Sequence, residues 1–395
     1  MTATRKLYWD DPFARAFEAE VVAHGRYGDW PSVVLAATAL YPESGGQTAD
    51  RGTLGGAAVL DVQVDDAGVI HHRVEGPLPE VGSRALGTVD GPRRRANMSL
   101  HTGQHLLSAA LVEAAGAATV SSRLGETACT IDLDREELSD ALVARAEALA
   151  NEIIDDDVVV EAFFPTPEAL AGLRLRRAPK VDAGIRVVRI GDFDLSPCGG
   201  THCTRSAQIG LVRVTGTERY KGKRRVSFEA GPRARAALGG AADVLGGLAR
   251  VFTCGPRDVP AAIERLRAEL GSAREAAGLL RARVADAVAE AALADPERMR
   301  ICECIDGADM ETLRVVARRL EGRAGMMFVL GGRSGDALKV LLGRGPGAGA
   351  DCGALARAIA HACGGKGGGR PDRAEVTLPA ATPWEAVAAH LLDRS

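Results

Sequence analysis

The chain has 395 residues, of which 46% are hydrophobic and 26% are charged, and its formal net charge at pH 7 is −3. That length is enough for two or three domains with separate cores, and the composition is that of a globular protein, not a disordered or fibrous one. No run of eighteen apolar residues occurs, which argues against a membrane span. The N-terminal residues carry no apolar signal core, and eight cysteines scattered over this length do not resemble a disulfide framework, so we expect a cytoplasmic protein.

Residues 1–92 are predicted to form a small β-barrel domain. Apolar and polar residues alternate over 32–39, 57–64 and 69–74, with Gly, Pro and Asp between these segments, which is typical of half-buried strands joined by turns. The segment Tyr41–Gln47 is a proline turn followed by Gly45 and Gly46. Such a turn exposes backbone N–H groups, so we expect it to let a ligand approach closely.

Residues 93–232 are predicted to form an α+β domain with its helices on one face of a sheet. Ser99 is a candidate N-cap for a helix over 100–115, which Gly116 would end. The elements expected after it are a strand at 127–133, a helix at 136–154, and strands at 158–164 and 185–190. The fold class expected for the whole chain is α+β.

The last third of the chain is predicted as a helical linker followed by an α/β domain. Residues 233–296 carry apolar side chains at three- and four-residue steps, which favours either one long helix or an antiparallel helical hairpin. In 297–395 we expect strands at 326–330 and 338–342, a helix at 351–362, and a glycine-rich functional loop at 364–372.

Two short motifs predict a metal site. His101 and His105 are four residues apart, so on a helix both imidazoles leave the same face. Cys198 and His202 bracket two glycines, which allow the backbone to fold tightly around an ion. Three histidines and one cysteine at this spacing indicate zinc, and zinc near a substrate would point to water activation and hydrolysis.

The residues also narrow the chemistry of that site. Thr102 stands where the metalloprotease motif His-Glu-x-x-His has its glutamate, so peptidase activity is disfavoured. Four protein ligands leave no certain open position for water, so zinc could organise the site without activating water. Cys203 is interpreted as a small buried residue, with alternate ligation as the minority reading.

Together, the two metal-ligand motifs resemble the editing domain of alanyl-tRNA synthetase and the alanyl-tRNA editing proteins. The resemblance runs along nearly the whole chain, in the order of the long form of these proteins. It is carried by several further segments: Leu7–Pro12, Tyr41–Gln47, Asp50–Gly52, Gly210–Arg213 and Gly367–Asp372. The last of these is similar to the RNA-binding domain, called DHHA1, that ends the synthetase.

This resemblance implies a zinc-dependent aminoacyl-tRNA deacylase that works without ATP. Its expected substrate is alanine tRNA wrongly charged with serine, or in some members with glycine. A synthetase pocket for a small apolar side chain cannot strongly reject an analogue with one extra hydroxyl, so a second, hydrolytic site is needed. The resemblance also implies a homodimer formed through the C-terminal region.

The resemblance assigns roles residue by residue. His101, His105, Cys198 and His202 would hold Zn²⁺, and Gln104, Thr38 and Arg225 would act in catalysis. Thr38 matches the family's threonine that hydrogen-bonds the seryl hydroxyl. The residues expected to bind substrate are Thr38, Gly45, Gly46, Gln47, Arg224, Arg225, Gly368 and Arg370.

Each of these assignments has a plainer interpretation. Gln104 could be an ordinary helix residue and Thr38 an ordinary strand residue, and Arg224 and Arg225 could form a basic hairpin tip before a strand at 226–229. The functional alternatives are a zinc-stabilised tRNA-binding protein without catalysis and an enzyme that edits another aminoacyl ester.

Overall fold

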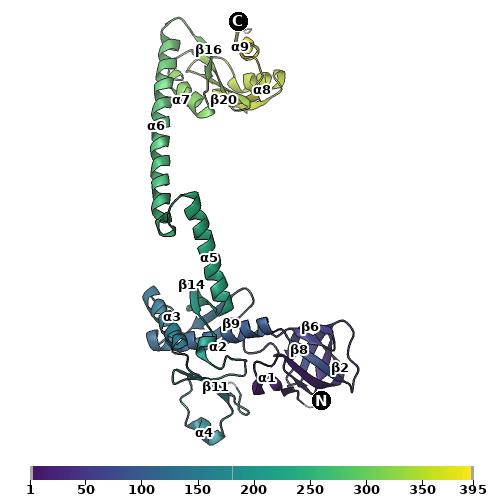
Figure 1. The fold of residues 1–395 in the computed structure, drawn as a ribbon. Coiled ribbons are helices and arrows are strands. Elements are labelled where there is room, and N and C mark those ends of the chain that lie inside the picture. Colours follow the sequence, from purple (N-terminus) through teal and green to yellow (C-terminus); the bar gives the residue numbers. More distant parts are fainter. Residues whose placement is uncertain (1–2, 180, 393–395) are drawn as a thin grey trace. The chain divides into compact units, whose positions relative to one another are not determined.

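The computed structural model describes residues 3–179 and 181–392. The chain consists of two compact units, residues 1–247 and 248–395. The boundary falls inside helix α5 (Pro232–Val251), within the segment predicted as a helical linker. Each unit is described by itself below, with the elements labelled as in Figure 1.

The first unit begins with a closed six-stranded β-barrel in the order β2-β3-β7-β6-β5-β8, which confirms the predicted N-terminal barrel. Its strands are β2 (Ala16–Tyr27), β3 (Trp30–Leu35), β5 (Gly52–Leu54), β6 (Ala57–Val64), β7 (Ile70–Glu75) and β8 (Arg84–Val89). Alternate residues such as Val33, Val62 and Ile70 fill its core. A short strand β1 (Arg5–Lys6) pairs in parallel with β4 (Ala37–Thr38), and helix α1 (Leu7–Asp10) follows β1.

Helix α2 (Gly91–Ala115) starts eight residues earlier than the predicted cap at Ser99. Asp90 is the N-cap, because its side chain accepts a hydrogen bond from the backbone N–H of Arg93, and the proline after Gly91 suits a first turn. Ser99 lies inside the helix and is buried. The prediction missed this start because the polar first turns of α2 carry no apolar periodicity.

Helix α2 packs against a mixed group of sheets in the rest of this unit. One antiparallel sheet has the order β14-β15-β10-β9 and another the order β11-β12-β13. The strands are β9 (Thr119–Leu124), β10 (Cys129–Leu133), β11 (Val160–Phe163), β12 (Val187–Ile190), β13 (Asp194–Pro197), β14 (Val212–Tyr220) and β15 (Lys223–Ala230). The helices are α3 (Asp140–Asp155), the short α4 (Pro167–Ala171) and the 3₁₀ turn η1 (Ser206–Gln208).

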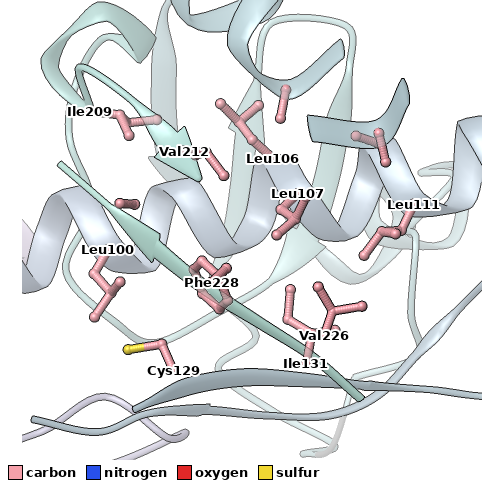
Figure 2. Close-up of a cluster of buried hydrophobic side chains, with 14 of the residues drawn as sticks. Leu100, Leu106, Leu107, Leu111, Cys129, Ile131, Ile209, Val212, Val226 and Phe228 are labelled. Carbon is pink, nitrogen blue, oxygen red and sulfur yellow. The ribbon is translucent and has the colours of Figure 1, made fainter. Parts of the chain in front are cut away.

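The core of this region lies around the middle of α2. Figure 2 shows the helix crossing the cluster, with the strands that carry Ile131 and Phe228 on one side of it. Leu106, Leu107 and Leu111 are fully buried here. Because the three leucines and the two histidines share one helix, this packing fixes the direction in which the histidines point.

The second unit contains the 3₁₀ turn η2 (Pro256–Asp258), the long helix α6 (Val259–Leu293) and a five-stranded sheet of order β16-β17-β18-β20-β19. Its strands are β16 (Arg300–Asp306), β17 (Met327–Ser334), β18 (Ala337–Arg344), β19 (Lys366–Gly369) and β20 (Arg373–Pro379), and its helices are α7 (Met310–Leu320), α8 (Cys352–Ala362) and α9 (Trp384–Leu392). The predicted α+β class is confirmed for the chain.

The glycine-rich segment 364–372 is partly an edge strand and not only a loop. Strand β19 pairs antiparallel with β20, and Gly367 lies opposite Val376. A Cβ atom on Gly367 would come within 2.8 Å of the Val376 side chain, so the glycine permits a close approach of the strands. A run of glycines predicts such approaches as readily as it predicts a loop.

Among the described residues no single helix is long and apolar enough to cross a membrane, and the segments Pro232–Val251 and Pro256–Leu293 meet the requirement only as a bent pair, by length and composition.

Candidate metal centre

The structure brings the four predicted ligands together. Their donor atoms, one each from His101, His105, Cys198 and His202, all lie within 4.8 Å of one another. Both histidines of the first pair come from α2, and the second pair comes from the loop after β13. The three histidine side chains are buried, with at most 3% of their surface exposed, so the cluster is walled by protein.

The distances between the donor atoms suit a tetrahedral ion. Cys198 Sγ lies 3.4 Å from His101 Nε2 and 3.3 Å from His202 Nε2. Zinc bonds of about 2.0 Å to nitrogen and 2.3 Å to sulfur, at tetrahedral angles, place neighbouring ligands roughly 3.3–3.6 Å apart. The cluster could therefore hold a metal ion such as zinc with little rearrangement.

Each histidine has its other ring nitrogen held by a partner. Nδ1 of His101 lies 2.7 Å from Gln47 Oε1, and Nδ1 of His105 lies 3.1 Å from Asp194 Oδ2. His202 Nδ1 lies 3.2 Å from Thr102 Oγ1, whose own proton goes to the Met98 carbonyl. These acceptors select the tautomer with the proton on Nδ1, which leaves every Nε2 lone pair for the metal.

Gln47 connects the barrel to the metal centre. Its Oε1 also accepts the backbone N–H of Thr201, and its Nε2 donates to Thr201 Oγ1 at 2.8 Å. Gln47 is 1% exposed, so its amide lies behind His101 and orients that ring. The turn before it is fixed by Gly46, whose φ is +88° and whose Cβ would come within 2.8 Å of the Ser122 carbonyl oxygen.

The loop that supplies Cys198 is fixed by hydrogen bonds that side chains donate to its carbonyl groups. Arg186 Nη1 donates to the carbonyls of Cys198 at 3.1 Å and Gly200 at 2.9 Å, and Trp9 Nε1 donates to the carbonyl of Gly199 at 2.8 Å. A Cβ atom at Gly200 would overlap the His101 ring, so only glycine fits at this position. The Gly200 N–H in turn lies 3.5 Å from the Cys198 sulfur.

The electrostatics favour the ligand form of the cysteine. Burial alone raises the pKa of the Cys198 thiol, but the adjacent imidazoles of His101, His202 and His105 more than offset this and hold the pKa well below its usual value. Burial lowers the pKa of His202 to about 3, so this ring is neutral near pH 7. Thiolate and neutral imidazole are the forms that bind zinc.

A cavity of about 670 Å³ opens onto one side of the cluster. Two of the four ligands, His101 and Cys198, line it, together with the Ser44–Gly46 turn, Ser121 and Ser122 of β9, and the aromatic rings of Tyr8, Trp9 and Tyr41. Its volume falls in the range of small-molecule sites. The cavity therefore reaches the cluster from the side of His101 and Cys198.

Two of the predicted site residues lie in buried hydrogen bonds. Thr38 is fully buried in the barrel and its Oγ1 lies 2.9 Å from His72 Nε2. His72 Nδ1 is held by the Val33 carbonyl, so its Nε2 accepts and Thr38 donates. Gln104 is 5% exposed and donates through Nε2 to Ser108 Oγ at 2.7 Å. Their roles in the site stay predictions.

The two predicted arginines lie within strand β15 and not before it, because that strand begins at Lys223. Arg225 makes two hydrogen bonds to Asp132, at 2.6 and 2.9 Å, and its guanidinium stacks 3.4 Å from the centre of the Tyr220 ring. Arg224 donates through Nη2 to Thr217 Oγ1 at 2.7 Å. Asp132 also accepts a hydrogen bond from the cavity residue Ser121.

The remaining predicted residues are distributed as follows. Gly45 and Gly46 line the cavity, with positive φ values of +59° and +88°. Gly368 and Arg370 belong to the second unit, where Gly368 is in β19 and Arg370 Nε lies 3.6 Å from Asp372 Oδ1 on the surface. Cys203 is 2% exposed and its backbone N–H donates to Thr102 Oγ1, as expected for a small buried residue.

Three residues of the centre were missed by sequence reasoning: Asp194, Arg186 and Trp9. Asp194 is buried and is also bound to Arg176 at 2.7 Å, and it holds His105 in place. The one available signal was an aspartate four residues before Cys198, since metal-bound histidines usually donate to a carboxylate.

Two segments of the chain, one central and one C-terminal, match known protein families. Residues 185–227 match the Threonyl and Alanyl tRNA synthetase second additional domain, and residues 299–393 match the DHHA1 domain. The first match contains Cys198 and His202 and the second contains the glycine-rich strand.

The similar proteins are alanine–tRNA ligases and an alanyl-tRNA editing protein. The alanyl-tRNA editing protein AlaX-L of Pyrococcus horikoshii is 36% identical over 58% of this chain and 58% of its own length. The alanine–tRNA ligases of Pyrococcus abyssi and Archaeoglobus fulgidus are 32% and 33% identical, each over 94% of this chain and 42% of their own length. The chain thus spans about half the length of the curated relatives that it matches.

Among solved structures, the C-Ala domain from Aquifex aeolicus alanyl-tRNA synthetase covers 24% of this chain at 21% identity and a TM-score of 0.23. From the sequence matches, the chain is a homologue of alanyl-tRNA editing protein AlaX-L and of the editing and C-terminal regions of alanine–tRNA ligases.

Proposed function

Starting from this homology, we propose that the chain is an aminoacyl-tRNA deacylase that removes serine wrongly attached to alanine tRNA. Glycine is the second amino acid that we expect it to remove. The observation that carries the proposal is the cavity that reaches the metal cluster along His101 and Cys198, beside a preorganised set of imidazoles. Deacylation of charged tRNA serves translation, which agrees with the cytoplasmic location expected from the sequence.

The chemistry required is modest. The bond to be broken is an ester, and when Zn²⁺ is bound it supplies Lewis-acid polarisation or a more acidic water. The protein's own contribution is to fix geometry: Gln47, Asp194 and Thr102 hold the three rings, and Arg186 holds the ligand loop. The cavity walls place the aminoacyl end of the RNA against this cluster and keep bulk water out of the rest of the site.

Thr38, Gln104 and Arg225 enter this proposal as residues that act from behind the cavity wall. Thr38 is bound to His72 and Gln104 to Ser108, while Arg225 holds Asp132, which accepts the Ser121 hydroxyl proton. Ser121 then faces the cavity as a hydrogen-bond acceptor, suited to the ammonium group of an amino acid. Gly45 and Gly46 contribute the close approach of a turn.

The decisive experiment is deacylation of purified seryl-tRNA(Ala) by the zinc-loaded full chain, with alanyl-tRNA(Ala) as the matched control. We expect fast release of serine, slower release of glycine and spared alanine. Serine release at the spontaneous rate, with tRNA still bound, would favour the alternative of a zinc-stabilised tRNA-binding protein. Release from a different aminoacyl ester, with seryl-tRNA(Ala) spared, would favour editing of another amino acid.

For the second unit we propose tRNA binding through strand β19 and its flanks. Lys366 is exposed at one end, Arg370 is exposed at the other, and the glycines between them let backbone N–H groups approach an RNA backbone. Exchange of Arg370 for glutamine should weaken tRNA binding for every charged amino acid alike, as filter binding would show. An effect confined to seryl-tRNA would contradict this proposal.

We also propose that the chain forms a homodimer through helix α6. Its first two-thirds present a seam of residues at alternating three- and four-residue steps: Ile263, Leu266, Leu270, Ala273, Ala277, Leu280 and Val284. The leucines are 48–59% exposed, although α6 packs against α7 from Ala285 onward. The exposed part of α6 contains Gly271 and Gly278 and is marginal in water by itself, so an apolar partner would stabilise it.

The charges beside the seam favour a parallel arrangement of two copies. In a parallel coiled coil Glu269 of one helix lies across from Arg274 of the other, which is attractive. An antiparallel pair would bring the flanking Arg267 and Arg274 of both helices together. The seam alternates with the strict seven-residue period that a two-stranded coil requires.

Sedimentation equilibrium of the full chain tests this proposal. The dimer should become a monomer on Leu270→Asp, while the matched change Ala268→Asp, on the opposite face of α6, should leave it dimeric. Glu269→Arg and Arg274→Glu should each weaken the dimer and together restore it. A monomeric wild-type chain, or equal effects of the two aspartate variants, would overturn the proposal.

A further inference from the structure

Apart from the Cys198 thiolate, which belongs to the metal cluster, the wall of the cavity carries positive charge and no carboxylate. Lys6, Arg177 and Arg186 line it, and no aspartate or glutamate among the described residues does. The chain is not short of acids, since it has 52 of them against 49 lysines and arginines. The neighbouring Arg176, which does not line the cavity, is paired with Asp194. The imbalance is therefore local to the cavity.

The direct partners of these three side chains are carbonyl groups and an aromatic ring, and none of them is a carboxylate. Arg186 is 7% exposed and donates to the carbonyls of Cys198 and Gly200. Arg177 donates through Nη2 to the Pro197 carbonyl at 3.1 Å. Lys6 Nζ lies 4.2 Å from the centre of the Trp9 ring. Carbonyls and an aromatic face orient a cation, but they do not supply the opposite charge.

Burial makes this arrangement costly in the absence of an anion. Burial lowers the pKa of Lys6, which reflects the free energy spent on keeping its charge away from water. A buried cation is normally paired with a carboxylate. A ligand that brings its own negative charge would recover this free energy on binding.

We infer that Lys6, Arg177 and Arg186 form an anion subsite that binds a phosphodiester of the RNA strand next to its aminoacylated end. This inference rests on the proposed function, because it takes the RNA 3′ end as the occupant of the cavity. Guanidinium groups suit phosphate oxygens through paired N–H donors. The amino acid itself brings an ammonium group and an ester, so the phosphodiester is the anionic part of such a substrate.

The subsite also gives Arg186 a connecting role. The same guanidinium that faces the cavity holds the carbonyls on either side of Gly199, directly after the ligand Cys198. A phosphodiester held there fixes how far the RNA strand enters, and the ester that follows it along the strand lies at the metal cluster. The loop of Cys198 to Gly200, with Arg186 bound to it, thereby sets both the position of the RNA strand and that of the ligand Cys198.

The test uses the non-aminoacylated trinucleotide CCA and inorganic phosphate as probes, with the zinc-loaded full chain in isothermal titration calorimetry. We expect Lys6→Gln and Arg177→Gln each to weaken CCA binding several-fold and to reduce the slope of log K against log salt by about 0.7 for each lost contact. Arg174→Gln is the matched control, because Arg174 is exposed in the same loop and does not line the cavity. Zinc content of each variant checks that the fold is intact.

The outcomes separate this inference from the proposed function. Unchanged CCA affinity and salt slope in both variants overturn the anion subsite, whatever the deacylation rate. Phosphate binding that is as tight as CCA binding, without inhibition of deacylation, overturns the phosphodiester assignment. Loss of CCA affinity in the two variants, with a wild-type chain that does not release serine, supports the subsite and contradicts the deacylase.

Discussion

The metal centre and the cavity beside it are built on opposite principles. At the metal centre every histidine has its outer nitrogen bound, by Gln47, Asp194 or Thr102, so the cluster is organised without help from a substrate. In the cavity Lys6, Arg177 and Arg186 have no carboxylate partner among the described residues. The contrast teaches that rigidity is concentrated where the ion would sit, while the charge needed to hold a substrate is left for the substrate to balance.

Removal of one ligand should weaken metal binding at the organised centre more than any other change. Cys198→Ala takes away the sulfur that lies between two histidine nitrogens. We expect zinc affinity to fall by more than about 100-fold, beyond the loss caused by removing an outer partner. Competition with a chelator measures it. Full zinc stoichiometry in this variant would rule out the proposed ligand set.

Gly200→Ala should act nearly as strongly through shape alone. A methyl group at this position overlaps the His101 ring and meets Gln47 Oε1 at 2.9 Å. We expect zinc affinity to fall by roughly 10–100-fold, since the ring and its partner must both move. Gly199→Ala is the control, because its nearest neighbour is Trp9 at 3.9 Å, an ordinary contact. Equal effects of the two changes would show that loop flexibility, and not this contact, matters.

Asp194→Asn tests whether the outer partners contribute to metal binding. The amide is uncharged and can present an N–H to His105, so the ring loses its preferred orientation. We expect a loss of zinc affinity toward the lower end of the 10–100-fold range. Asp192→Asn in the same turn, where the residue is exposed, should have no effect. An unchanged chelator titration for the Asp194 variant would show that the outer partners do not contribute to zinc affinity.

The barrel contains a buried histidine outside the metal cluster, His72, and both of its ring nitrogens are hydrogen-bonded. Burial lowers its pKa to about 4 from an ordinary 6.5. Between pH 6.5 and 4, His72 is therefore protonated in the unfolded chain and neutral in the folded chain. The free energy of unfolding falls as the pH drops through this range. We expect about 2 kcal/mol less stability at pH 5 than at pH 7 from this residue. Urea unfolding of His72→Gln should show that much less pH dependence; an identical pH profile would contradict the assignment.

The parts of the fold that are written locally in the sequence were predictable. The barrel follows from alternation, and the histidines at i and i+4 followed from helical geometry. The start of α2 did not, because Asp90 caps a polar first turn and the prediction relied on apolar periodicity. The glycine-rich segment was read as a loop because a strand formed by glycines has no side-chain pattern.

The outer partners of the metal centre were out of reach for a different reason. Gln47 is separated by 54 residues from His101, Asp194 by 89 from His105, and Thr102 by 100 from His202. Each is a common residue, and its position in the sequence does not show which histidine it contacts. Only the fold brings these residues together. The four ligands were predictable because histidine and cysteine are residue types that bind zinc.

The distance along the chain between the two ligand pairs has a consequence for synthesis. His101 and Cys198 are 97 residues apart. At a ribosomal rate of about 5–20 residues per second, the first pair leaves the ribosome roughly 5–20 seconds before the second. During that interval two histidines on a completed helix face an unfinished site. A metal ion held by all four residues would therefore be bound late in synthesis, after His202 has left the ribosome.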